Sequence, residues 1–170
     1  MPSGRVHEAI NLTVLGLGGL VYLAQSPKEA LGEPRVLAFA LSYLVGTFLV
    51  TPDLDLAEKR VRAKGRWGIL GVLWWPYGVL FRHRGLSHTW ILGPLTRLLY
   101  LAFVLYLFWV LLRGVYAYLE GGAAVSLRLS IPSLPREVLL SMLLGYYLSQ
   151  WLHLLADGIL PDHDFKGRPR

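Results

Sequence analysis

Histidine and aspartate side chains recur at the ends of the apolar stretches of this 170-residue chain. Imidazole and carboxylate groups whose lone pairs converge can bind a divalent cation, and they can also act as general acids and bases. The chain has five histidines and no cysteine, so any metal must be held by imidazole, carboxylate or water. The candidate metal ligands are His7, Asp53, Asp55, His83, His88, His153 and Asp157.

The spacing of these residues predicts that several of them meet. His153 and Asp157 are four residues apart on an expected helix, so their side chains share one face, as two ligands of one ion must. Asp53 and Asp55 follow Pro52, which ends a helix. A locally extended backbone there would send both carboxylates to the same side.

The segment His83–His88 places two imidazoles around Gly85, and such a loop can fold both rings inward. Seven candidates exceed one tetrahedral shell. They fit either a two-metal site, or a single ion with some of the residues hydrogen-bonded to the ligating imidazoles and orienting them. We therefore expect one or two divalent ions, with zinc as the preferred metal.

Two further roles follow from the same residue types. A carboxylate that is not a ligand, Asp55 or Glu8, is expected to act as the catalytic general base. Arg82 and Arg84 bracket His83, and they either bind a phosphate or carboxylate group of a substrate or serve as basic residues flanking a membrane span.

The elements that must position these residues are predicted to be transmembrane helices. The chain is 54% hydrophobic and 16% charged, with a mean hydropathy of +0.46, whereas a soluble domain averages about 25% charged residues. Apolar runs long enough to cross a hydrocarbon core recur along it. We expect an all-α membrane bundle of about four spans in a single domain, over residues 9–25, 36–52, 89–119 and 137–160.

Two other segments have different patterns. Residues 67–81 are apolar and aromatic but too short and too rich in glycine to span easily, which favours an interfacial or re-entrant segment. Within residues 120–136, the stretch Val125–Ile131 alternates between apolar and polar, as in a short strand or a surface-lying ribbon. Within the third span, Arg97 is expected to extend its guanidinium toward the membrane interface.

The distribution of basic residues predicts the orientation. Most of the 17 lysines and arginines fall in segments that share one side when four spans are drawn, so both termini are expected to be cytoplasmic, in the inner (plasma) membrane. All the candidate ligands then lie at the cytoplasmic end. The basic run Lys59–Arg66 abuts the membrane, which favours contact with anionic lipid over nucleic-acid binding.

The motifs together resemble a known group of proteins. An N-terminal His7 is followed by Pro-Asp-Leu-Asp at 52–55, His-Arg-Gly-Leu-Ser-His at 83–88 and His-Leu-Leu-Ala-Asp at 153–157. This set resembles the YdjM-like membrane-bound metal-dependent hydrolases, and most closely a related group of metal-binding membrane proteins. The resemblance implies Asp53, His83, His88, His153 and Asp157 as ligands, with His7 and Asp55 next.

Two functions of different class are consistent with these residues. The first is a metal-dependent hydrolase acting at the cytoplasmic membrane face on a phosphoester or ester, either a lipid or a soluble substrate. The alternative is a non-catalytic metal-binding, sensing or transport protein, although transporters place polar ligands near the bilayer midplane, where this chain is apolar. A helical scaffold that docks a partner at its polar end is a third possibility.

Overall fold

A computed structural model of the chain describes residues 3–26, 31–56, 61–81, 83, 85–119 and 133–161. Within these ranges the secondary structure is helical and includes no strand, which confirms the expected all-α class for this part of the chain. The elements in chain order are α1 (Gly4–Gln25), α2 (Pro34–Phe48), the 3-10 helix η2 (Pro52–Asp55), α3 (Arg62–Arg66), the 3-10 helix η3 (Gly68–Trp74), α4 (Trp75–Leu80), the 3-10 helix η4 (Leu86–His88), α5 (Leu92–Leu119) and α6 (Arg136–Ala156).

Three helices, α1, α5 and α6, are long and apolar enough to cross a membrane by length and composition. The helix α2 is apolar but has only 15 residues. The second span was expected to continue to residue 52, but α2 ends at Phe48, and Thr51 adopts an extended conformation. This conformation is the one that a residue preceding proline favours, because the proline ring clashes with a helical neighbour.

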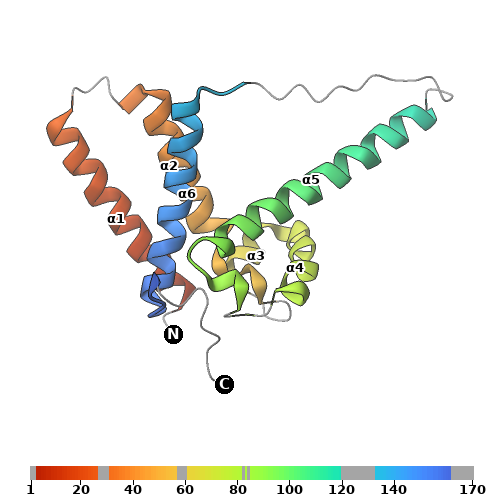
Figure 1. The fold of residues 1–170 in the computed structure, drawn as a ribbon, viewed down its shortest axis with the longest axis horizontal. Coiled ribbons are helices and arrows are strands. Elements are labelled where there is room, and N and C mark those ends of the chain that lie inside the picture. Colours follow the sequence, from red (N-terminus) through yellow and green to blue (C-terminus); the bar gives the residue numbers. More distant parts are fainter. Residues whose placement is uncertain are drawn as a thin grey trace.

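The helices α2 and α6 lie in close contact, and two glycines allow it (Figure 1). A Cβ atom on Gly46 of α2 would lie 2.1 Å from the Ser149 hydroxyl, and one on Gly145 of α6 would lie 2.3 Å from the Phe39 carbonyl oxygen. Neither position can take a larger side chain without separating the helices. The start of α1 and the end of α6 are at the same end of the molecule as α3 and α4.

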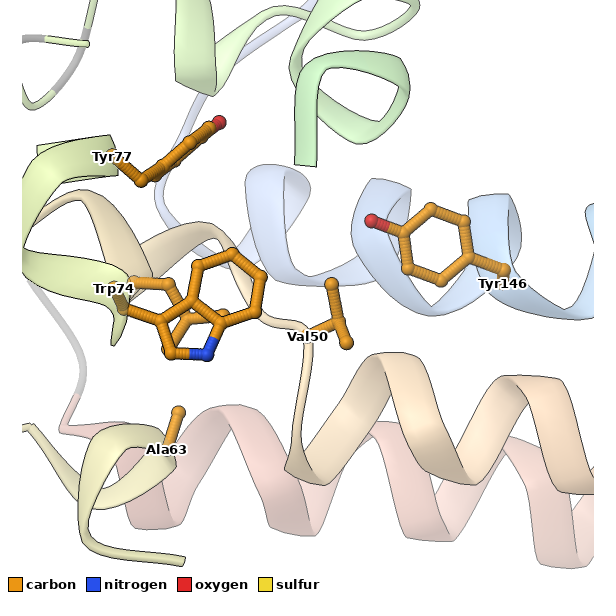
Figure 2. Packing of buried hydrophobic residues seen from close by; sticks show 6 residues of the cluster. Val50, Ala63, Trp74, Tyr77 and Tyr146 are labelled. Carbon is orange, nitrogen blue, oxygen red and sulfur yellow. The ribbon is translucent and has the colours of Figure 1, made fainter. Parts of the chain in front are cut away.

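A small aromatic core sits at that end of the molecule. Its buried members come from five different elements and the segment after α2, and Figure 2 shows Trp74 with Tyr77, Ala63 and Val50 around it. Leu54 of η2 is fully buried in this cluster. Because Leu54 separates Asp53 from Asp55, burying it fixes the turn that carries both carboxylates.

Arg97, in the second turn of α5, does not reach toward the interface as expected. Its side chain is fully buried, and it donates hydrogen bonds to the Ser87 carbonyl oxygen at 2.7 Å and to Gln150 Oε1 at 3.0 Å. Gln150 in turn donates to the Gly46 carbonyl oxygen at 3.1 Å. Arg97 therefore links α5 to η4 and α6, and through Gln150 to the end of α2. A buried guanidinium is costly unless its N–H groups have acceptors, and these two residues supply them.

The aromatic segment 67–81 is helical, as η3 followed by α4, and several of its apolar side chains are highly exposed, including Ile69 at 89% and Leu80 at 71%. Its placement at a membrane surface stays a prediction. Most of the segment expected to form a strand or ribbon, residues 120–132, lies outside the described residues.

Candidate metal centre

The described residues include two ligand groups, and the first joins His7 of α1 to His153 and Asp157 at the end of α6. The two imidazole rings stack with centroids 3.8 Å apart and planes 9° from parallel. Asp157 presents one oxygen to each ring, at 3.4 Å from His7 Nε2 and 3.6 Å from His153 Nε2. Asp53 adds a fourth candidate, with Oδ1 3.6 Å from His153 Nε2.

These separations are too long for hydrogen bonds, for which about 2.7–3.2 Å is typical. In keeping with this, His153 Nε2 and both Asp157 carboxylate oxygens are buried without a hydrogen-bond partner, and so is Nδ1, the other ring nitrogen of His7. Two ligands of a tetrahedral zinc ion, at bond lengths of about 2.0–2.1 Å, would lie about 3.3 Å apart. The spacing and chemistry of this group therefore fit a divalent ion better than they fit direct contacts among the side chains.

The register that brings His7 to His153 is set one helical turn away. Asn11 of α1 is buried, and its side-chain amide donates to the Ser149 carbonyl oxygen of α6 at 3.2 Å. Tyr43 of α2 donates to the Asn11 carbonyl oxygen at 2.9 Å. Because Asn11 follows His7 by four residues and Ser149 precedes His153 by four, this polar contact places the two imidazoles at one level.

The second ligand group consists of Asp55, His83 and His88. The Asp55 carboxylate lies 2.7 Å from His83 Nδ1 and 3.0 Å from His88 Nδ1, and it accepts a hydrogen bond from the Ser87 hydroxyl. A carboxylate bound to two Nδ1 atoms orients the rings and leaves their Nε2 atoms as the available metal donors. Consistent with this, His88 Nε2 is buried without a hydrogen-bond partner.

The two aspartates of the Pro-Asp-Leu-Asp motif therefore point to different groups, and the expectation that both carboxylates share one side is wrong. The cause is local geometry: residues 52–55 form a 3-10 helix instead of an extended segment. In a helix with three residues per turn, positions i and i+2 diverge. Asp53 thus contacts His153, whereas Asp55 contacts His83 and His88.

The environment keeps the carboxylates ionised. Burial by itself raises the pKa of Asp55, but hydrogen bonds with His83, His88 and Ser87 outweigh it, so the pKa lies well below its usual range. The pKa of Asp53 is likewise lowered, since burial is outweighed chiefly by His153 and also by the charges of His88 and His7. Asp53 is therefore within electrostatic reach of imidazoles from both groups.

The pKa of the third carboxyl group, that of Asp157, is also lowered. Burial raises the pKa of Asp157, but its interactions with His7 and His153 outweigh that effect and lower it. All three carboxyl groups are thus held in the anionic form, which is the form that binds a cation.

A cleft of about 450 Å³ opens beside the first group, and His7, Asp53 and His153 line part of its wall. Glu8 also lines this cleft and makes ion pairs with Arg66 at 2.6 Å and Arg62 at 3.4 Å. Glu8 is therefore next to the first group, whereas Asp55 is fully engaged with its three partners. The two predicted substrate-binding residues, Arg82 and Arg84, lie outside the described residues.

Several residues near the centre were not foreseen from the sequence, namely Asn11, Thr51, Ser87, Arg5 and Arg62. Three of them had a usable signal. Ser87 lies within the His-Arg-Gly-Leu-Ser-His motif, and Arg5 lies two residues before His7. Asn11 is the only asparagine of the chain, and a lone amide in an apolar helix predicts a buried hydrogen bond.

In the part of the chain that the structure describes, fold and site together define a helical protein with three membrane-length apolar helices and buried His/Asp groups suited to a metal ion. A family model described as "Uncharacterized metal-binding protein (DUF2227)" matches residues 2–166. The chain belongs to this metal-binding family.

Comparison with individual proteins adds one relative. A protein of Aquifex aeolicus (strain VF5), described as "Uncharacterized protein", is 46% identical over 63 residues. Those residues are 37% of this chain and 43% of that protein, so the chain matches less than half of the relative's length. No solved structure matches the chain.

Proposed function

We propose that this protein is a membrane-embedded, metal-dependent hydrolase whose centre lies at the cytoplasmic face of the membrane and acts on a phosphoester or ester. The observation that carries the proposal is the first ligand group, in which buried nitrogen and oxygen atoms converge without hydrogen-bond partners. Leaving each such group unsatisfied costs about 1–3 kcal/mol, which a bound cation would offset. The resemblance to YdjM-like hydrolases supports the enzymatic part of the proposal.

The first group, His7, His153 and Asp157 with Asp53, would hold the ion, and the nitrogen and oxygen donors suit zinc. When bound, the cation would polarise a phosphoryl or carbonyl oxygen and lower the pKa of a water molecule. A second ion, or a shared one, would use the Nε2 atoms of the second group, with Asp55 holding the rings in place.

The chain's own residues supply the other requirements. Glu8 lines the cleft that borders the first group, so its carboxylate is the proposed proton acceptor. Its pairs with Arg62 and Arg66 fix the side chain in place. Asp55 is buried and bonded to three side chains, so we propose that it positions the imidazoles and does not take the proton.

The orientation in the membrane is part of the same proposal. The distribution of basic residues supports placing the start of α1 and the end of α6 in the cytoplasm, which would put the metal centre where soluble substrates and inner-leaflet headgroups both reach it. Residues 67–81 would then lie along the same surface.

Detergent-purified protein loaded with zinc tests the hydrolase. We expect chelator-sensitive hydrolysis of generic phosphoester or ester substrates, and Glu8→Gln should reduce kcat by about 100-fold or more while the metal content is unchanged. Glu33→Gln is the matched control, because Glu33 is an exposed carboxylate paired with Arg35 away from the centre. Bound metal without any turnover would contradict the hydrolase and favour a non-catalytic metal-binding or sensing protein.

A further inference from the structure

The cleft beside the first ligand group has features that bind anions. Its lining includes Ser3, Gly4 and Arg5 at the start of the 22-residue helix α1, and Arg62, whose side chain lies close to Gly4. The first amides of a helix have no intrahelical acceptor, and the helix dipole favours negative charge at this end. The Ser3 side chain makes no capping hydrogen bond to these amides.

Buried polar groups with no partner line the same cleft and point independently to a ligand. Thr51 is 7% exposed and its hydroxyl has no hydrogen-bond partner. Thr51 belongs to neither ligand group, so a metal ion held by His7 and His153 would not supply a partner for its hydroxyl. A hydroxyl in this position can donate to an oxygen of a bound anion.

The balance of charge in the cleft also favours an anion once a cation is bound. Glu8 is paired with Arg62 and Arg66, and the two charges of a divalent ion bound by Asp53 and Asp157 would balance those two carboxylates. Arg5, together with the second of the two arginines beside Glu8, would then leave a positive excess. The volume of about 450 Å³ falls in the range of small-molecule sites.

We propose that this cleft is the subsite for a phosphoryl group, so that the substrates are phosphoesters and not neutral carboxylic esters. The phosphoryl oxygens would be bound by Arg5, Arg62, the Thr51 hydroxyl and the first amides of α1. Three oxygens that accept several hydrogen bonds match this set of donors, whereas a neutral ester offers one carbonyl oxygen. The inference rests on the proposed function for the reaction, but the binding it describes can be measured without turnover.

The test titrates inorganic phosphate into zinc-loaded, full-length protein in detergent and follows binding by calorimetry. We expect Arg62→Ala to raise the Kd for phosphate by about tenfold, because a charge-assisted hydrogen bond is lost. Thr51→Val, which keeps the shape of the side chain, should raise it by a smaller factor. Both variants should keep their zinc. Arg35 is exposed, pairs with Glu33 and does not line the cleft, so the control variant Arg35→Ala should bind phosphate as the wild type does.

Absent phosphate binding by the zinc-loaded wild type, or binding unchanged in Arg5→Ala, Arg62→Ala and Thr51→Val, would overturn the proposal. Two competitors distinguish the source of the phosphoryl group: displacement at lower concentration by micellar phosphatidic acid indicates a lipid headgroup, and displacement at lower concentration by glycerol phosphate indicates a soluble ester. Phosphate binding without hydrolysis would remove the hydrolase and keep the subsite. Hydrolysis of carboxylic esters with no phosphate binding would keep the hydrolase and remove the phosphoryl subsite.

Discussion

The two ligand groups use the same side-chain types but differ in how their polar atoms are satisfied. In the second group, Asp55 is within 2.7–3.0 Å of two imidazole nitrogens. In the first group, the shortest contact is 3.4 Å, and both Asp157 oxygens lack hydrogen-bond partners. A bound cation would satisfy the unpartnered atoms of the first group, whereas the members of the second group already satisfy one another. The difference supports the proposal that the first group is the primary metal site and that Asp55 orients the imidazoles of the second.

The largest expected effect is the loss of metal from the first group. His153→Ala should weaken zinc binding by more than about 100-fold, because deleting a ligand costs more than the 10–100-fold typical of outer residues. The measurement is zinc content and competition with a chelator in detergent. Gln150 provides no control because it is buried in the same network, so Ser141→Ala, at a half-buried position of α6 about three turns before His153, is used. Zinc affinity unchanged in His153→Ala would refute the primary site.

A smaller effect is expected at Asp55. Asp55→Asn keeps the size of the side chain but removes the charge that orients two imidazoles, so zinc affinity should fall by about 10–100-fold with the same number of ions per chain. The same competition titration measures it. If Asp55→Asn instead lowers the number of bound ions by one, Asp55 is itself a ligand. The second group would then be a metal site in its own right.

The smallest effect is expected at Ser87, whose hydroxyl donates to Asp55. Ser87→Ala removes one hydrogen bond, worth about 1 kcal/mol, so zinc affinity should fall about fivefold. Titrations of Ser87→Ala, alone and combined with Asp55→Asn, measure this. If Ser87 acts through Asp55, the double variant should bind zinc no more weakly than Asp55→Asn alone. Additive losses would show that Ser87 acts independently.

The helices were the part of the fold that sequence reasoning handled best. Long apolar runs predicted α1, α5 and α6, because the apolar composition persists through many turns. The four-residue spacing of His153 and Asp157 also translates directly into neighbouring side chains, since that spacing is nearly one helical turn. Both inferences depend only on residues within a single helix.

What could not be predicted depends on contacts between elements or on short helices. The sequence Asp53-Leu54-Asp55 is compatible with either an extended segment or a 3-10 helix. The packing of Leu54 in the aromatic core favours the 3-10 helix, and the local sequence does not reveal that packing. The sequence suggested that Arg97 is a basic residue near a membrane surface, but its acceptors belong to other elements: the Ser87 carbonyl in η4 and the Gln150 side chain in α6. No local pattern encodes such a pairing.

The anchoring of Arg97 has a consequence for the far end of α5. This helix has 28 residues, so it is about 42 Å long at 1.5 Å per residue, and a hydrocarbon core is about 30 Å thick. Because Arg97 ties the first turns of α5 to the level of the metal centre, the helix cannot slide along its axis to share the excess between both surfaces. In a bilayer α5 must therefore lean away from the membrane normal or extend beyond the opposite leaflet, and thickening the bilayer should bring it closer to upright.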